Sequence, residues 1–165
     1  MFYELSLALL FILSILFQVS FIDALYEPLN AIPAHFIIGV LVMHRGDALH
    51  GIAWFIISGF ALKIFGFDSA LTISYIAVAF IGALLATRMF ANRSVYALEG
   101  LGILMLLVFI LVNAIPELLN YSITADYFYS YNHALISVIV GLYLGFLVAR
   151  NLEHLIENLF LIKKR

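Results

Sequence analysis

The stretch from Val95 to Ile115 reads VYALEGLGILMLLVFILVNAI, and its only charged residue is Glu99. About 20 apolar residues in a helix cross the hydrocarbon core of a bilayer, which is about 30 Å thick. A backbone inside lipid must satisfy its own hydrogen bonds, and this run lacks the strict alternation of a barrel strand. The stretch therefore predicts a membrane-spanning α-helix.

The rest of the chain contains further apolar runs of this kind. Further apolar runs cover residues 5–22, 31–43, 51–65, 70–87 and 134–149. Together the six runs predict an all-α, polytopic integral membrane helical bundle that forms a single transmembrane domain over residues 1–165. The run at 31–43 rises only about 20 Å, so it is a short helix, a re-entrant segment or a helix that extends further. Five and six transmembrane helices both stay open, and so does the side of the N-terminus.

The composition agrees with a membrane domain. The chain has 165 residues, of which 65% are hydrophobic and 11% are charged, and its mean hydropathy is +1.14. A soluble domain is about half apolar and about a quarter charged. These values argue against an ordinary soluble enzyme, a nucleic-acid binder and a disordered chain. The absence of cysteine excludes disulfides and thiolate chemistry.

The basic residues predict the orientation. If there are six crossings, one side carries Arg45, Arg88, Arg93, Arg150, Lys163, Lys164 and Arg165, and the other side carries Lys63 alone. Cytoplasmic loops are enriched in Lys and Arg, so the C-terminus is expected in the cytoplasm, with residues 150–165 as an amphipathic tail. A five-crossing arrangement with a re-entrant second segment and an outside N-terminus distributes these charges in the same way.

Small residues recur at helical spacing in two of the runs. They are Ser137, Gly141, Gly145 and Ala149 in the last run, and Ala79, Gly82, Ala83 and Ala86 in the fourth. Small residues on one helix face let another helix backbone approach closely. The pattern predicts helix packing within the chain, with a seam for a partner protein as the alternative.

Three polar residues fall inside the apolar runs: Gln18, Glu99 and Asn113. A carboxylate inside a membrane is costly unless it is paired or wet, and we expect Glu99 to pair with Arg88 or Arg93 at the cytoplasmic edge. No second ionisable partner within the runs is evident, which argues against a proton pump.

Histidines raise the question of a metal site. His35, His44, His50 and His133 are present, but no paired-histidine zinc motif occurs. There is also no phosphate-binding Gly-rich loop and no Ser in a recognisable nucleophile elbow. The sequence therefore predicts no metal, no cofactor and no enzymatic activity.

The pattern from Leu5 to Leu104 resembles the rod shape-determining protein MreD family. The matching features are a first helix that ends near a Gln, a Pro-initiated second helix, an Arg-Gly turn, a Gly-rich third helix and a fourth helix with a central Gly and a basic end. In this chain they are Leu16-Phe17-Gln18, Ile32-Pro33, Arg45-Gly46, Gly51 with Gly59-Phe60, and Gly82 with Arg88. One departure is Lys63, where the family usually has an Asp.

The resemblance implies a non-enzymatic scaffold of the cell-elongation and peptidoglycan-synthesis machinery in the bacterial inner membrane. Its expected partners are the lipid bilayer, an MreC-like bitopic protein and wall-synthesis enzymes, with no nucleic acid. The family is similar in fold to the substrate-binding membrane subunits (S-components) of energy-coupling-factor (ECF) transporters. The alternative function is therefore a vitamin-type transporter subunit, with an outer pocket lined by Trp54, Asn113, Tyr121 and His133.

Overall fold

The computed structural model describes residues 2–22, 33–45, 47–64, 69–92, 94–119, 132, 135–148 and 150–151. Within these ranges the chain is helical with short turns and contains no strand, which confirms the all-α prediction. The elements are α1 (Phe2–Phe17), a π-helical turn η1 (Gln18–Ile22), α2 (Ala34–Arg45), α3 (Ala48–Ile64), α4 (Ser69–Arg88) and α5 (Val95–Leu119). A further helix covers Leu135–Val148 and is called helix 135–148.

Three helical stretches are long and apolar enough to cross a membrane: Glu4–Ile22, Leu71–Arg88 and Val95–Pro116. The other three helices, α2, α3 and helix 135–148, are apolar but shorter. This pattern is compatible with a membrane protein. The 12 residues of α2 rise about 18 Å, well short of the hydrocarbon thickness.

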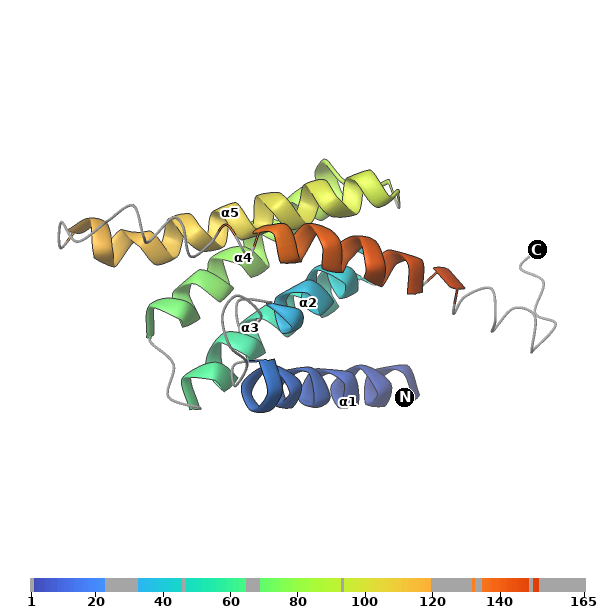
Figure 1. The fold of residues 1–165 in the computed structure, drawn as a ribbon, viewed down its shortest axis with the longest axis horizontal. Helices are drawn as coiled ribbons and strands as arrows, with labels where there is room; N and C mark the ends of the chain where they lie inside the picture. The colour runs from blue at the N-terminus through green and yellow to red at the C-terminus, as the bar shows by residue number, and fades with distance from the viewer. Residues whose placement is uncertain are drawn as a thin grey trace.

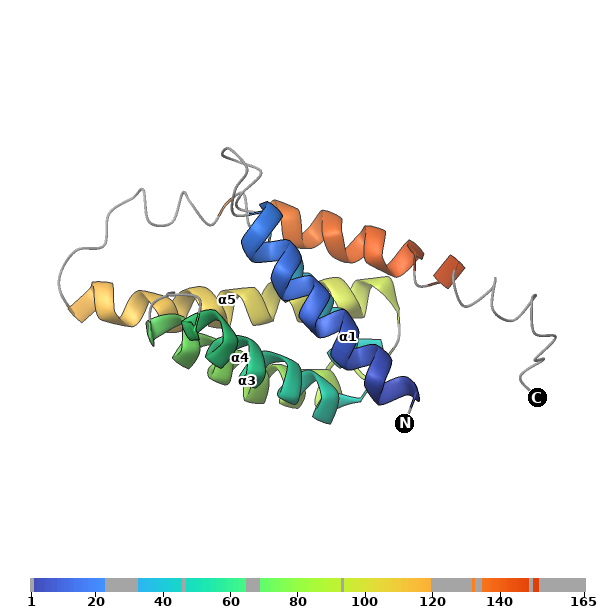
Figure 2. The same cartoon turned by 90° about the horizontal axis from the view of Figure 1, so that it is seen from below.

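The short helix α2 lies at the centre of the bundle. It contacts α1, α3, α4 and α5, and most of its side chains are buried. Successive helices run in opposite directions along the long axis of the molecule, with α1 on one outer side (Figures 1 and 2). A helix surrounded by other helices has little contact with lipid, so α2 does not need the full length of a span.

The helix starts follow from local sequence. Pro33 precedes α2, and its carbonyl accepts the hydrogen bond of the Ile37 N–H at 2.9 Å. Asp47 precedes α3, and its Oδ1 accepts from the Leu49 N–H at 3.3 Å. Ser94 precedes α5, and its Oγ accepts from the Ala97 N–H at 3.2 Å. Side-chain oxygens at these positions satisfy amides that have no partner within the helix.

Glycines set the closest approach between α2 and α3. A Cβ built on Gly51 would lie 2.5 Å from the Met43 Cβ and 2.8 Å from the Met43 Cα. A Cβ built on Gly39 would lie 2.7 Å from the Trp54 Cδ1. The two backbones therefore touch in the way that small residues permit inside membranes.

The small residues of helix 135–148 also face α2. A Cβ on Gly141 would lie 2.5 Å from the Ile37 Cδ1, and a Cβ on Gly145 would lie 2.6 Å from the Leu41 Cδ1. Ser137 is half-buried on this helix, and Ala149 lies outside the described residues. This small-residue face is thus used for packing within the chain.

The small residues of α4 are likewise internal. Gly82 packs against Met105 of α5 and Met43 of α2. The neighbouring alanines belong to the buried hydrophobic core; they are Ala79, Ala83 and Ala86. Both small-residue stripes therefore contribute to the bundle interior.

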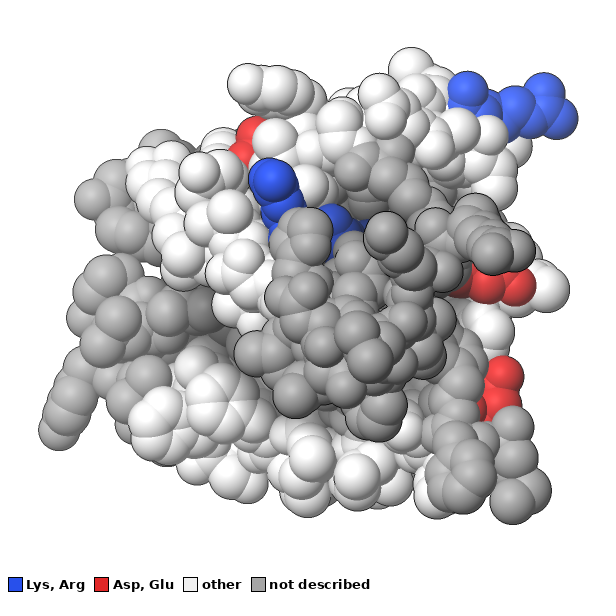
Figure 3. Space-filling model, turned by 90° about the vertical axis from the view of Figure 1, so that its right-hand side faces the viewer, with Lys and Arg blue, Asp and Glu red and all other residues white. Residues whose placement is uncertain are grey.

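One end of the bundle, the charged end, brings ionisable residues from several helices together. The Arg45 guanidinium at the end of α2 lies 4.7 Å from the centre of the Phe146 ring. Glu4 at the start of α1 lies 3.2 Å from His50 at the start of α3. Figure 3 looks onto this end and shows both acidic and basic atoms there.

The charged end also includes the turn between α4 and α5. His44 of α2 donates from Nε2 to the Asn92 carbonyl at 3.1 Å, and Arg88 is the last residue of α4. Lys63 lies at the opposite end, which we call the far end, because it closes α3. The start of α1 and the described basic residues other than Lys63 therefore share one end of the bundle.

Candidate functional site

The most polar buried feature of the described chain is centred on His35, in the first turn of α2. Its side chain is 1% exposed. The ring Nδ1 lies 2.6 Å from the Ser14 Oγ of α1, and the ring Nε2 lies 2.5 Å from the Ser58 Oγ of α3. His35 therefore connects three helices through both ring nitrogens.

Aromatic side chains enclose the imidazole ring. Trp54 of α3 stacks on His35 with ring centres 5.1 Å apart and 22° between the planes. Phe11 of α1 meets both rings edge-on, at 5.3 Å from His35 and 5.0 Å from Trp54. The Trp54 indole N–H donates to the His35 carbonyl at 3.3 Å. Such offset and edge-to-face contacts add to the packing energy of buried rings.

Gln18 completes the attachment of α1. Its Oε1 accepts a hydrogen bond from the His35 backbone N–H at 3.3 Å. This amide lies in the first turn of α2, where it has no acceptor within the helix. Ser14 and Gln18 are four residues apart, so they lie on the same face of their helix. That face is the polar contact between α1 and the rest of the bundle.

Both serines also donate to carbonyls of their own helices. The Ser58 hydroxyl donates to the Trp54 carbonyl at 2.5 Å, and the Ser14 hydroxyl donates to the Phe11 carbonyl at 2.8 Å. A neutral imidazole has one N–H donor and one acceptor nitrogen. A neutral His35 ring therefore donates to one of the two serine oxygens and accepts from the other hydroxyl, which it shares with a backbone carbonyl.

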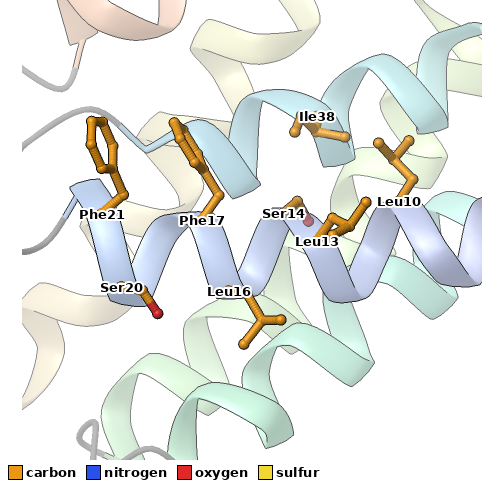
Figure 4. Close-up of a pocket in the computed structure, with 8 residues that line it drawn as sticks. All are labelled: Leu10, Leu13, Ser14, Leu16, Phe17, Ser20, Phe21 and Ile38. Carbon is orange, nitrogen blue, oxygen red and sulfur yellow. The ribbon is translucent and has the colours of Figure 1, made fainter.

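An open surface groove of about 640 Å³ lies along α1 and η1 beside this site, and Ile38 of α2 borders it (Figure 4). Its lining residues are Leu10, Leu13, Ser14, Leu16, Phe17, Ser20, Phe21 and Ile38. Only the two serines among them carry a polar side chain. The groove is therefore an open apolar depression, with Ser14 among the residues that line it.

Buried polar side chains are concentrated in the half of the bundle nearer the far end. They are Ser14, His35, Ser58, Thr72 and Ser74, whereas His44 is buried near the charged end. Thr72 of α4 donates to the Gly59 carbonyl of α3 at 2.9 Å. The half nearer the charged end is filled instead by residues such as Met43, Ala83 and Leu98. Buried polar side chains thus interrupt the apolar core mainly in the half nearer the far end, where Phe36, Phe55 and Tyr75 are also buried.

The intramembrane polar residues from the sequence lie at different sites. Gln18 belongs to the His35 cluster. Glu99 is half-buried in α5 and makes no ion pair with a described residue; Arg93 lies outside the described residues. Asn113 is half-buried in the second half of α5.

The residues expected to line an outer pocket are not assembled within the described chain. Trp54 is 2% exposed and packs against His35 and Phe11. The groove is not lined by Trp54 or Asn113. Tyr121 and His133 lie outside the described residues.

No group of three His, Asp or Glu side chains among the described residues could hold a metal ion. Two histidines of the charged end have other contacts. His50 lies between Glu4, at 3.2 Å, and Asp47, at 3.9 Å, while His44 bonds to a backbone carbonyl.

Comparison of the chain with protein-family models, with curated proteins and with solved structures finds no match.

Sequence reasoning missed Ser14, Ser58 and the bonding of His35. The available signal was weak. Ser14 and Gln18 are polar residues one helical turn apart in α1, and Trp54 and Ser58 are one turn apart in α3. Each pair would have indicated a polar stripe on an apolar helix, without showing that the stripes meet.

Proposed function

We propose that this protein is an integral membrane scaffold of the bacterial cell-elongation and peptidoglycan-synthesis machinery, as its resemblance to the MreD family implies. Four matching motifs lie at helix ends of the structure. Gln18 begins the π-helical turn, Pro33 precedes α2, Arg45 ends α2 and Arg88 ends α4. Motifs at such positions are expected to define turns and spans.

The observation that best supports a scaffold is the outer face of α1. Only 17% of the span Glu4–Ile22 is buried, against 39% of the spans in α4 and α5. Its exposed large side chains include Leu5, Leu9, Ile12 and Leu16. These positions are spaced by four, three and four residues, so they form one stripe along the helix.

The proposed occupant of this stripe is the single transmembrane helix of an MreC-like bitopic protein. The small-residue faces of α4 and helix 135–148 pack inside the chain, which leaves α1 as the less packed surface among the long spans. A second helix on α1 would be held by van der Waals packing, since lipid and leucine are equally apolar.

We further propose that the protein crosses the membrane six times, with both termini in the cytoplasm. The supporting observation is the charged end, where Glu4, Arg45 and Arg88 gather away from Lys63. The excess of basic residues at this end favours a cytoplasmic location. A shared end for the start of α1 and the end of α2 favours an even number of crossings.

The scaffold proposal is tested by site-specific photo-crosslinking in native membranes, followed by mass spectrometry. A photoreactive residue replaces Leu9 or Leu16, and the controls replace Ile73 or Phe80, which are at least as exposed on α4. We expect an MreC-like protein to be crosslinked from the α1 positions and much less from the controls. Absence of any wall-synthesis component from α1 crosslinks and from a mild-detergent pull-down would contradict the scaffold.

A transporter subunit is the second candidate, and one observation favours it. The polar interior near the far end, including His35, Thr72 and Ser74, would lie toward the outside in the proposed orientation. A small polar ligand entering from outside would meet these groups. Recovery of ATPases with a coupling membrane subunit in the same pull-down would support this candidate over the scaffold.

A further inference from the structure

We propose that the contact of His50 with Glu4 and Asp47 is a pH-sensitive latch, which holds the start of α1 against the start of α3 when the imidazole is protonated. The ring lies between two carboxylates. Its Nε2 is 3.2 Å from the Glu4 Oε1 of α1, and its Nδ1 is 3.9 Å from the Asp47 Oδ2 just before α3. The latch belongs to the charged end and does not depend on the scaffold function.

The protonation state of the ring decides how it meets the two carboxylates. A neutral imidazole has one N–H and one nitrogen with a lone pair, whereas a protonated ring has an N–H at both nitrogens. A neutral His50 can therefore direct its N–H toward Glu4 or Asp47, and it turns a lone pair toward the other carboxylate. The protonated ring directs an N–H toward each of them and adds a positive charge. Hydrogen bonds between charged groups are about twice as strong as neutral ones, so protonation strengthens the contact between α1 and α3.

Other ionisable side chains at the charged end also act on the ring. His44 and Arg45 close α2, Arg88 closes α4, and Glu99 lies near the start of α5. The arginines repel a charged imidazole, and a carboxylate attracts it. Both described ion-pair contacts of the His50 ring are with carboxylates, so the charged ring has an attractive neighbour at each nitrogen.

α1 is the long span whose position depends most on such a contact. Only 17% of Glu4–Ile22 is buried, against 39% of the spans in α4 and α5. The second half of α1 is held at Ser14 and Gln18, which bond to His35 of α2. The His50 latch acts near the opposite end of the helix. Loss of the ring proton therefore weakens the attachment of the first turns, while the second half of α1 keeps its own contacts.

The direction of the pH response follows from these charges. Imidazole side chains change charge between about pH 8 and pH 5, whereas carboxyl groups in water gain a proton near pH 4. The latch is therefore strongest at the acidic end of the range from about pH 8 to about pH 5.5. It weakens as the pH rises, because the ring loses the proton that pairs it with the second carboxylate.

The test is a distance measurement by pulsed electron paramagnetic resonance on the whole protein in lipid nanodiscs. Because the chain has no cysteine, spin labels can be attached at Leu5→Cys and Leu49→Cys, which are exposed near the starts of α1 and α3. We expect the ratio of the short-distance to the long-distance population to rise about 2- to 5-fold between about pH 8 and about pH 5.5, as a surface ion pair allows. A second labelled pair, Ile12→Cys with Ile57→Cys, should not respond, because it reports on the part of α1 that His35 holds.

Three variants, each carrying the first pair of labels, separate the latch from a general effect of pH. His50→Gln keeps a polar side chain but cannot take up a proton, and Glu4→Gln removes the negative charge from α1, so each should abolish the response. His44→Gln is the matched control, because it changes another histidine of the charged end and leaves the latch in place; it should keep the response. A wild-type distance distribution that is the same at both pH values, or a response that persists in His50→Gln, would overturn the proposal.

Discussion

At the scale of single residues, His35 is the side chain on which the contact between α1 and the bundle depends. Its ring meets Ser14, Ser58 and Trp54 at once. We expect His35→Ala to lower the free energy of unfolding by about 2–4 kcal/mol, through lost ring packing and interhelical hydrogen bonds. Reversible unfolding in detergent, followed by circular dichroism, measures the change.

The half-buried His50 provides the control for this prediction. It contacts Glu4 at 3.2 Å at the surface of the charged end, where ion pairs contribute at most about 1 kcal/mol. His50→Ala should therefore have a small effect. An equal loss of stability in the two variants would show that His35 is not the central contact.

The His35 cluster could not be predicted from the sequence, because its members are far apart along the chain. Ser14 and Ser58 lie 21 and 23 residues from His35, and each lies in a mainly apolar run. Gln18 was recognised as an intramembrane polar residue, but nothing in the sequence identifies its acceptor role toward the His35 amide.

At the scale of helices, the two kinds of glycine contact predict different tolerances. A methyl group at Gly51 would meet the backbone and Cβ of Met43, whereas one at Gly141 would meet the flexible end of Ile37. Gly51→Ala should therefore cost about 1–3 kcal/mol by overpacking. Gly141→Ala should change stability by less than about 1 kcal/mol, since alanine also favours the helix.

The same unfolding measurement ranks these two substitutions. A Gly141→Ala protein that is less stable than Gly51→Ala would contradict the distinction between a rigid backbone contact at Gly51 and a flexible side-chain contact at Gly141. Replacing both Gly141 and Gly145 with Leu is a stronger change, because the larger side chains separate helix 135–148 from α2.

The helices themselves were largely predictable, since long apolar runs in a membrane leave little choice but α-helix. The run at 95–115 corresponds to α5, Val95–Leu119, and the run at 70–87 to α4, Ser69–Arg88. The central position of α2 was not predictable. A short apolar run has the same composition whether protein or lipid surrounds the helix. Only the residues that pack against it distinguish a central helix from a lipid-facing one.

At the scale of the whole molecule, the charged end leads to a test of the topology. The chain contains no cysteine, so single cysteines can be introduced without further change. In intact cells, a membrane-impermeant maleimide should label Lys63→Cys but not Glu4→Cys, Asp47→Cys or Asn92→Cys. Disrupting the membrane should make all four reactive.

The decisive position in this experiment is Glu4→Cys. In a five-crossing arrangement with an outside N-terminus it would react in intact cells together with Lys63→Cys. The sequence alone left these arrangements open because the first run has no Lys or Arg beside it. The contact between Glu4 and His50 places the start of α1 at the charged end, which favours the six-crossing proposal.

The close contact of Gly51 with Met43 also bears on how the chain enters the membrane during synthesis. α2 is too short to span the hydrocarbon core alone. α1 is long enough to insert first, and until α2 follows, its Ser14 and Gln18 side chains would face hydrocarbon. Because the α2 and α3 backbones touch, the two helices can leave the translocon as one hairpin. Since Ser14 and Gln18 find their His35 contacts on α2, we expect α1 to gain these polar contacts only after that hairpin is made.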